Sequence, residues 1–181
     1  GTVAPQQPHG YGAGLMATAF QAGQEGDVHG ASEAQPNPNL RLWLRLLSCT
    51  TIAEKRLRRR LAEQFDTTLP RFDVLAALER EPGGLAMTEL SQRLLVSNGN
   101  VTAVVQQLAK LGHVSVIKPE HDRRSSIVTM TDAGRAHFAT VAREHHGWVE
   151  EMFAGIGADD RDQLYRLLAV LRGSLDQSEE R

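Results

Sequence analysis

The sequence predicts a mainly α-helical chain with one small β hairpin. Apolar residues recur at helical spacing over most of the chain after residue 40. Around Val114 and Val116, and again from Ile127 to Met130, the spacing changes to the alternation that is typical of strands. The 181 residues are 41% hydrophobic, 23% charged and 5% aromatic, which is the composition of a globular protein and argues against a membrane or collagen-like chain.

Residues 1–39 differ in composition from the rest of the chain. They are rich in glycine and proline and contain no lysine or arginine. Such a segment cannot bury enough apolar surface to offset its chain entropy. We therefore expect an N-terminal extension over 1–39 that is disordered or foreign to the native protein, and one domain over 40–181.

Start and stop signals divide this domain into six helices. Asn39 and Thr131 suit N-cap positions, and Pro70 suits a first helical turn. A Pro-Gly-Gly break at 82–84 ends the second helix, and Gly112 suits a left-handed C-terminal cap. The expected helices cover about 40–64, 70–81, 88–94, 98–111, 132–154 and 159–174.

Two short helices joined by a turn and followed by a charged hairpin predict a winged helix-turn-helix over about 70–131. The helix at 98–111 would enter the major groove of DNA, with its N-terminal residues facing base edges. Amide and hydroxyl side chains at its start suit base and phosphate contacts; they belong to Ser97, Asn98, Asn100, Thr102 and Gln106.

The tip of the hairpin carries Asp122, Arg123 and Arg124. A carboxylate two residues from an arginine can fix the direction of its guanidinium, which then loses less entropy on entering a minor groove. The alternative is a solvated charged turn without a binding role. The position of this tip directly after a helix-turn-helix favours the DNA-binding interpretation.

Two segments, "MTELSQRLLVSNGNVTAVVQQLAKLGHV" and "DRRSSIVTMTDAGR", resemble the winged-helix core of the MarR family of transcriptional regulators. The resemblance implies that residues 97–106 read the DNA groove and that Asp122 and Arg124 form the wing pair. It also implies a homodimer built by helices 40–64 and 132–176, bound to a pseudo-palindromic operator on double-stranded DNA. Many family members carry arginine where this chain has Ala103, so direct readout is expected to depend on amides, hydroxyls and the wing.

Within the family, "RLWLRLLSCT", "TLPRFDVLAAL" and "SNGNVT" are similar to regulators that sense hydroxycinnamoyl- or other aryl-CoA thioesters. That similarity implies repression of aromatic catabolism or efflux genes, relieved by a small aromatic or aryl-CoA effector. The effector would bind in a crevice between the dimerisation helices and the DNA-binding domain. Candidate lining residues are Trp43, Arg45, Leu46, Arg71 and Phe72.

Five cations lie within the six residues 55–60. They form either a solvated face that touches DNA or the partner subunit, or a site at which Arg56 and Arg59 bind the phosphates of a CoA effector. Residues 40–64 hold 7 basic and 2 acidic groups, so the net charge of -2 conceals +5 on the first helix. The total charge therefore argues only against an indiscriminate polyanion binder.

The remaining candidate sites are weaker. Cys49 is expected to be a buried structural thiol, with a peroxide sensor as the alternative. His137 and the pair His145–His146 are expected on the surface and not around a metal. No enzyme motif, cofactor site, membrane span or signal peptide is visible, so we expect a cytoplasmic protein that is not an enzyme. The alternatives are a redox-sensing regulator using Cys49 and a protein-interaction module that has lost DNA binding.

Overall fold

The computed structural model describes residues 37–117 and 126–178. The chain divides between residues 41 and 42 into two units, and the described fold belongs almost entirely to the second. The N-terminal extension expected over 1–39 lies, up to residue 36, outside the described residues. No helix of the described ranges is long and apolar enough to cross a membrane.

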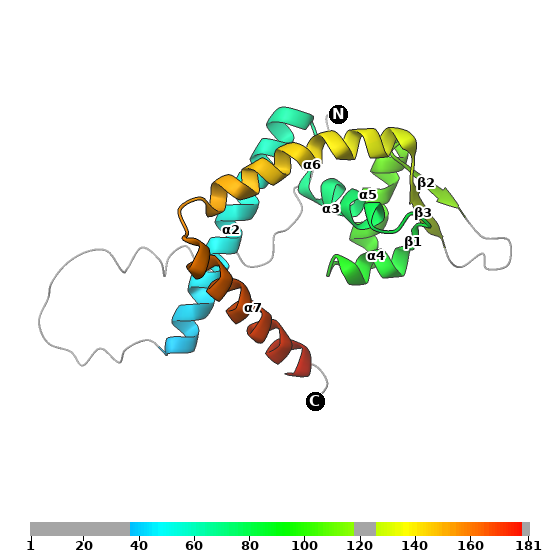
Figure 1. Ribbon diagram of the computed structural model, residues 1–181. Coiled ribbons are helices and arrows are strands. Elements are labelled where there is room, and N and C mark those ends of the chain that lie inside the picture. The colour runs from blue at the N-terminus through cyan, green and yellow to red at the C-terminus, as the bar shows by residue number, and fades with distance from the viewer. Residues whose placement is uncertain (1–36, 118–125, 179–181) are drawn as a thin grey trace, which may run out of the picture. The chain divides into compact units, whose positions relative to one another are not determined.

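The structure confirms a mainly helical chain with a small antiparallel sheet (Figure 1). In chain order the elements are α2 (Pro38–Phe65), α3 (Leu69–Glu79), β1 (Leu85–Ala86), α4 (Met87–Arg93), α5 (Asn98–Lys110), β2 (Val114–Ile117), β3 (Ile127–Met130), α6 (Asp132–Phe153) and α7 (Ala158–Ser178).

Local capping explains where several helices begin. Thr68 and Thr131 accept hydrogen bonds from the main-chain N–H groups of Arg71 and Gly134, and they begin α3 and α6. The expectation that Asn39 caps the first helix is wrong. The Oδ1 atom of Asn37 accepts the N–H of Asn39 at 2.9 Å, and Pro38 takes the first helical position, where a missing N–H costs nothing.

The sheet has three strands, not the two that the hairpin predicts. β2 and β3 pair in antiparallel register from Val114 opposite Met130 to Ile117 opposite Ile127. β1 adds to the free side of β3, with Leu85 opposite Val128. A strand of two residues is too short to show alternation, which is why the sequence pattern does not reveal it.

The winged domain has its own apolar core between α3, α4, α5 and the sheet. Its buried residues are Val74, Leu75, Leu78, Leu85, Leu90, Val101, Val105, Leu108, Val114, Val128 and Met130. A second cluster joins α2, α3 and α6 through Leu61, Phe72, Val141 and Trp148. Phe72 therefore connects the winged domain to the long helices.

The junction between α5 and α6 is close-packed. Gly112 has φ +73, and the N–H of His113 donates to the Leu108 carbonyl, which closes α5 as the sequence predicts. The Thr131 hydroxyl donates to the Gly112 carbonyl at 2.6 Å. A Cβ at Gly134 would overlap the carbonyl oxygen of His113, so only glycine fits where α6 passes over this loop.

Candidate functional site

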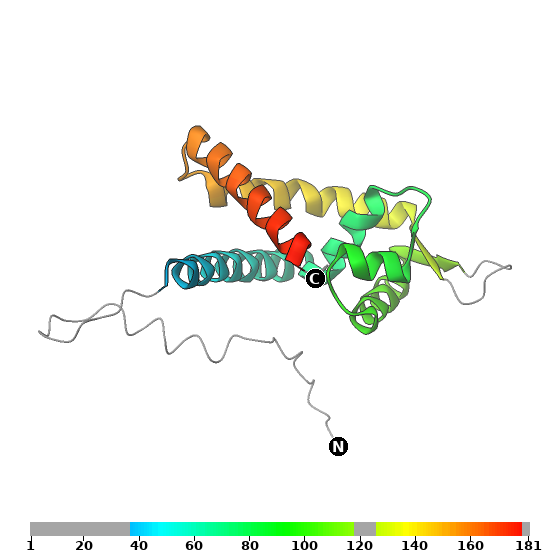
Figure 2. The same cartoon turned by 90° about the horizontal axis from the view of Figure 1, so that it is seen from below.

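The turn between α4 and α5 places the start of α5 on the surface. Leu95 adopts a left-handed conformation with φ 53, and the Val96 N–H donates to the Ser91 carbonyl at 3.1 Å. Ser97 then caps α5 by accepting the N–H of Asn100. In both views the sheet lies beside α4 and α5 (Figures 1 and 2), and β1 leads directly into α4. This arrangement is a helix-turn-helix followed by a wing.

α5 has one buried face and one polar face. Val101, Val105 and Leu108 are at most 1% exposed and fix the helix to the core. Ser97, Asn98, Asn100 and Gln106 are exposed, whereas Thr102 is half-buried. The Thr102 hydroxyl donates to the Asn98 carbonyl at 2.8 Å, so its oxygen keeps only acceptor capacity.

The charge at this face is compatible with a polyanion. α5 contains no carboxylate, and Lys110 lies in its last turn. Its unpaired N-terminal N–H groups favour a phosphate. The wing residues Asp122, Arg123 and Arg124 lie outside the described residues, although the strands that lead to them are described.

The residues that the sequence suggests for effector binding do not lie together in the structure. Trp43, Arg45, Arg56 and Arg59 are exposed on α2, and Leu46 is half-buried. The Arg71 Nε atom donates to Gln107 Oε1 at 3.1 Å, which ties α3 to α5.

Phe72 is part of the core. Its ring stacks on His145 at 4.4 Å between centroids and packs against Phe138 at 5.5 Å. Only 8% of Phe72 is exposed. An effector could reach this ring only if the surrounding side chains moved.

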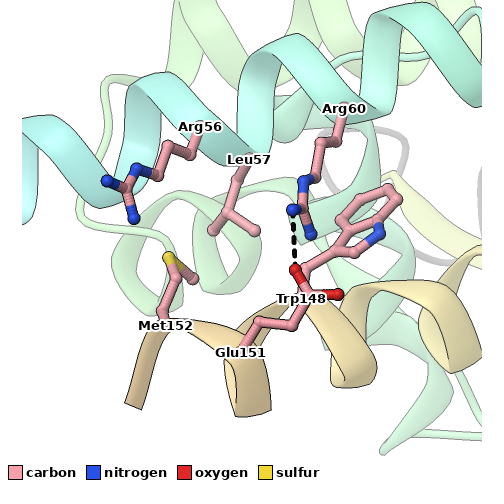
Figure 3. Close-up of a pocket in the computed structure, with 6 residues that line it drawn as sticks. All are labelled: Arg56, Leu57, Arg60, Trp148, Glu151 and Met152. Atoms are coloured by element: carbon pink, nitrogen blue, oxygen red, sulfur yellow. Dashed lines mark ion pairs between the residues drawn. The ribbon is translucent and has the colours of Figure 1, made fainter. Parts of the chain in front are cut away.

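A pocket of about 150 Å³ lies between α2 and α6. Arg56, Leu57 and Arg60 from α2 face Trp148, Glu151 and Met152 from α6 across it (Figure 3). Of the effector candidates, only Arg56 lines this pocket. Arg60 belongs to the basic run at 55–60, whereas Leu57, Trp148, Glu151 and Met152 were not anticipated as lining residues. Helical periodicity shows which face of α6 is apolar but not which part of α2 it meets.

Arg60 is held by two partners in this pocket. Its guanidinium pairs with Glu151 at 2.6 Å, and its Cζ atom lies 5.7 Å from the centroid of the Trp148 ring. Trp148 is 5% exposed and also packs against Phe65. The pocket therefore borders the cluster that contains Phe72.

Several titratable groups between the helices have shifted pKa values. Burial, and then the nearby Glu54 carboxylate, raise the pKa of Asp73 to about 6, while Arg58 opposes the shift. Burial lowers the pKa of His137 and of His145, with smaller contributions from His113 and His146 respectively.

Two expectations about single residues are wrong, one of them only in part. His146 is exposed as expected, whereas His137 and His145 are half-buried and stack on His113 and Phe72. Cys49 is exposed on α2, so it is not a buried thiol. Within residues 37–117 and 126–178 no three potential metal ligands gather.

Comparisons with known proteins agree with this geometry. A profile described as MarR family matches residues 65–125. The transcriptional activatory protein BadR of Rhodopseudomonas palustris is 34% identical over 115 residues, which are 62% of this chain and 65% of BadR. The match thus spans slightly less than two thirds of that relative.

A second relative and a solved structure extend the comparison. The transcriptional repressor MprA of Escherichia coli is 27% identical over 130 residues, or 71% of this chain and 73% of MprA. A MarR variant from Escherichia coli complexed with operator DNA has the same fold, with a TM-score of 0.67, 22% identity and coverage of 75% of this chain and 96% of that one. The winged-helix segment of this chain is thus similar to the MarR family of transcriptional regulators, whose profile covers residues 65–125.

Proposed function

We propose that the protein is a homodimeric transcriptional regulator that binds a pseudo-palindromic operator through α5. The main support is the start of α5, where Ser97, Asn98, Asn100 and Gln106 are exposed opposite a buried apolar face. Amides suit the edge of adenine, and hydroxyls suit bases or phosphates. In the wing, Asp122 orients Arg124, and Arg123 and Arg124 reach the minor groove or the phosphates.

The dimer is supported by apolar side chains that one chain leaves in solvent. Leu42, Trp43 and Ile52 on α2 are each at least 51% exposed. On α7 the exposed apolar residues include Leu164, Tyr165, Leu167, Leu168 and Val170. A second copy covering these faces would set two α5 helices about one turn of DNA apart.

The regulator responds to a small aromatic or aryl-CoA effector and acts in the cytoplasm as a repressor of aromatic catabolism or efflux genes. MprA is named a repressor, whereas BadR is named an activator, so the direction of control needs its own test. The residues proposed to bind the effector are Trp43, Arg45, Leu46, Arg56, Arg59, Arg71 and Phe72. A reporter gene behind the operator, with and without the regulator, measures the sign directly.

A mobility shift with the DNA upstream of the protein's own gene tests DNA binding. We expect a shift that weakens at higher salt, and a loss of about tenfold in affinity for Asn100→Ala, because a good base contact contributes about 1–3 kcal/mol. Gln64→Ala removes an exposed amide from α2 and serves as the control. If the protein gives no shift at low salt, it is a protein-interaction module and the proposal fails.

A redox-sensing regulator is the second candidate, favoured only by the exposure of Cys49. Under that alternative, peroxide releases the wild-type protein from DNA and Cys49→Ser does not respond. Equal behaviour of the two proteins eliminates it.

A further inference from the structure

Asn98 and Gly99, at the start of α5, are a pair of residues that react with each other in water. The main-chain nitrogen of the residue after an asparagine attacks the Cγ atom of the asparagine side chain, and glycine hinders this attack least because it has no Cβ. The chain has four asparagines, and only Asn98 precedes a glycine. The other three, at positions 37, 39 and 100, precede proline, leucine and valine. The sequence therefore favours this reaction at one asparagine.

The structure leaves both partners of this reaction accessible. Asn98 and Gly99 are exposed, and nothing lies within 4 Å of the place that a Cβ of Gly99 would take. Among residues 37–117 and 126–178, the N–H of Gly99 donates no hydrogen bond, as is usual in the first turn of a helix. The nitrogen that must attack is therefore available.

The first turn of α5 can open without disturbing the core. Its cap is a long hydrogen bond, 3.4 Å from the main-chain nitrogen of Asn100 to the Oγ atom of Ser97. The first buried side chain of the helix belongs to Val101, so the turn before it does not anchor α5. The bond from the Thr102 hydroxyl to the Asn98 carbonyl must also break. Helix ends fray, and fraying gives Asn98 the backbone freedom that ring closure needs.

We propose that Asn98 and Gly99 form a modification site, at which Asn98 becomes aspartate or isoaspartate and the affinity of the chain for DNA falls. The Gly99 nitrogen forms a bond to Cγ of Asn98, its hydrogen passes to the side-chain amide nitrogen, and ammonia leaves. Water then opens the resulting succinimide ring. Attack of water at Cγ gives aspartate, and attack at the main-chain carbonyl carbon gives isoaspartate, in which the chain runs through the side chain. Water is the only other reactant, and nothing is oxidised or reduced.

The consequence for DNA rests on the proposed function of α5. The helix contains no carboxylate, so the product carries the first negative charge on the face proposed to meet DNA. That charge repels phosphates, and the amide hydrogens with which Asn98 could donate to a base are lost. The same charge lies at the positive end of the helix dipole, where it stabilises α5. The aspartate form therefore keeps its fold while its affinity for DNA falls.

Peptide mass spectrometry of the full chain, kept in mildly alkaline buffer, tests the chemistry without DNA. We expect a carboxyl group to replace the amide of Asn98, while the amide of Asn100 stays unchanged. Gly99→Ala should slow the reaction severalfold, because its Cβ crowds the attacking nitrogen, and this Cβ fits the open space at the site. Gly147→Ala is the matched control, since it also adds a methyl group in open space on a helix and should leave the rate unchanged.

Mobility shifts with the DNA upstream of the protein's own gene test the consequence. Asn98→Asp should weaken binding by at least about tenfold, with a thermal midpoint no lower than that of the wild type. Gln64→Glu adds the same charge at an exposed position of α2 and should weaken binding much less. The wild type should lose affinity as its Asn98 is converted, whereas Gly99→Ala should keep the affinity that it has when fresh.

The inference is overturned if Asn98 keeps its amide, or if the two glycine variants react at the same rate. It is also overturned if Asn98→Asp binds DNA as tightly as the wild type, or binds weakly only because its thermal midpoint has fallen. If fresh wild-type protein gives no shift, the proposed function fails together with the effect on DNA. The mass measurement still decides in that case whether Asn98 is modified.

Discussion

The winged domain and helix α7 use apolar side chains in opposite ways. In the winged domain Leu75, Leu90 and Leu108 are at most 2% exposed. On α7, Leu167 is 59% and Val170 is 71% exposed, and no residue from 158 to 177 is buried. Among the described residues, the winged domain thus closes its own core, whereas α7 leaves apolar side chains in solvent, which is the feature on which the proposed dimer depends.

A substitution in the winged core should have the largest effect. Leu90→Ala leaves a cavity in a fully buried site and should lower the free energy of unfolding by about 2–5 kcal/mol. Denaturant unfolding followed by circular dichroism measures this loss, which should be the same at every protein concentration. A loss below about 1 kcal/mol would show that the core is not closed within one chain.

The junction between the two regions should be the next most sensitive place. Gly134→Ala puts a methyl group onto the His113 carbonyl and should cost about 1–3 kcal/mol. Gly147→Ala, more than three turns further along α6, meets nothing within 4 Å and should instead stabilise the helix by about 0.5–1 kcal/mol. Thermal unfolding compares the pair, and equal effects of the two substitutions contradict the close approach.

Charge on α7 should affect assembly more than folding. Leu167→Asp places a carboxylate in the face proposed to meet the second copy and should weaken dimerisation by at least about tenfold. Arg166→Ala changes a neighbouring exposed residue and serves as the control. Sedimentation equilibrium measures both constants, and an unchanged constant for Leu167→Asp would remove α7 from the interface.

The smallest effect concerns pH. The folded pKa of Asp73 is raised from 3.8 to about 6, so its stabilising contribution is complete below pH 3.8 and is lost as pH rises through about 6. Asp73→Asn stays neutral and should gain stability over the wild type between pH 4 and pH 8, by less than about 1 kcal/mol because the carboxyl is partly solvated. Unfolding curves across that range detect the gain, and Glu79→Gln on the same helix is the control. A constant difference at all pH values contradicts the raised pKa.

The sequence predicts local structure well where one residue type determines it. Thr131 begins α6 and Gly112 ends α5, because caps are local features. The polar face of α5 follows from helical periodicity in the same way. The prediction that Asn39 caps α2 is wrong because Asn37 and Asn39 are both residue types that suit an N-cap. Pro38 favours the first helical position, which makes Asn37 the cap.

Contacts between distant segments could not be predicted in this way. Phe72 was expected to line a crevice and is instead stacked on His145, since an aromatic residue on an apolar face serves either purpose. The pocket depends on which turn of α2 lies opposite Trp148, and no spacing within α2 or α6 contains that information. The roles of Asp122, Arg123 and Arg124 stay predictions.

Selection from a random-sequence DNA library by the purified protein examines both regions at once. A winged domain that reads bases, carried by a symmetric dimer, should enrich an inverted repeat whose half-site centres lie about 10 base pairs apart. Asn100→Ala should lose preference at one position in each half-site. An enriched single half-site without symmetry would contradict the dimer, and the absence of any enriched sequence would contradict DNA reading by α5.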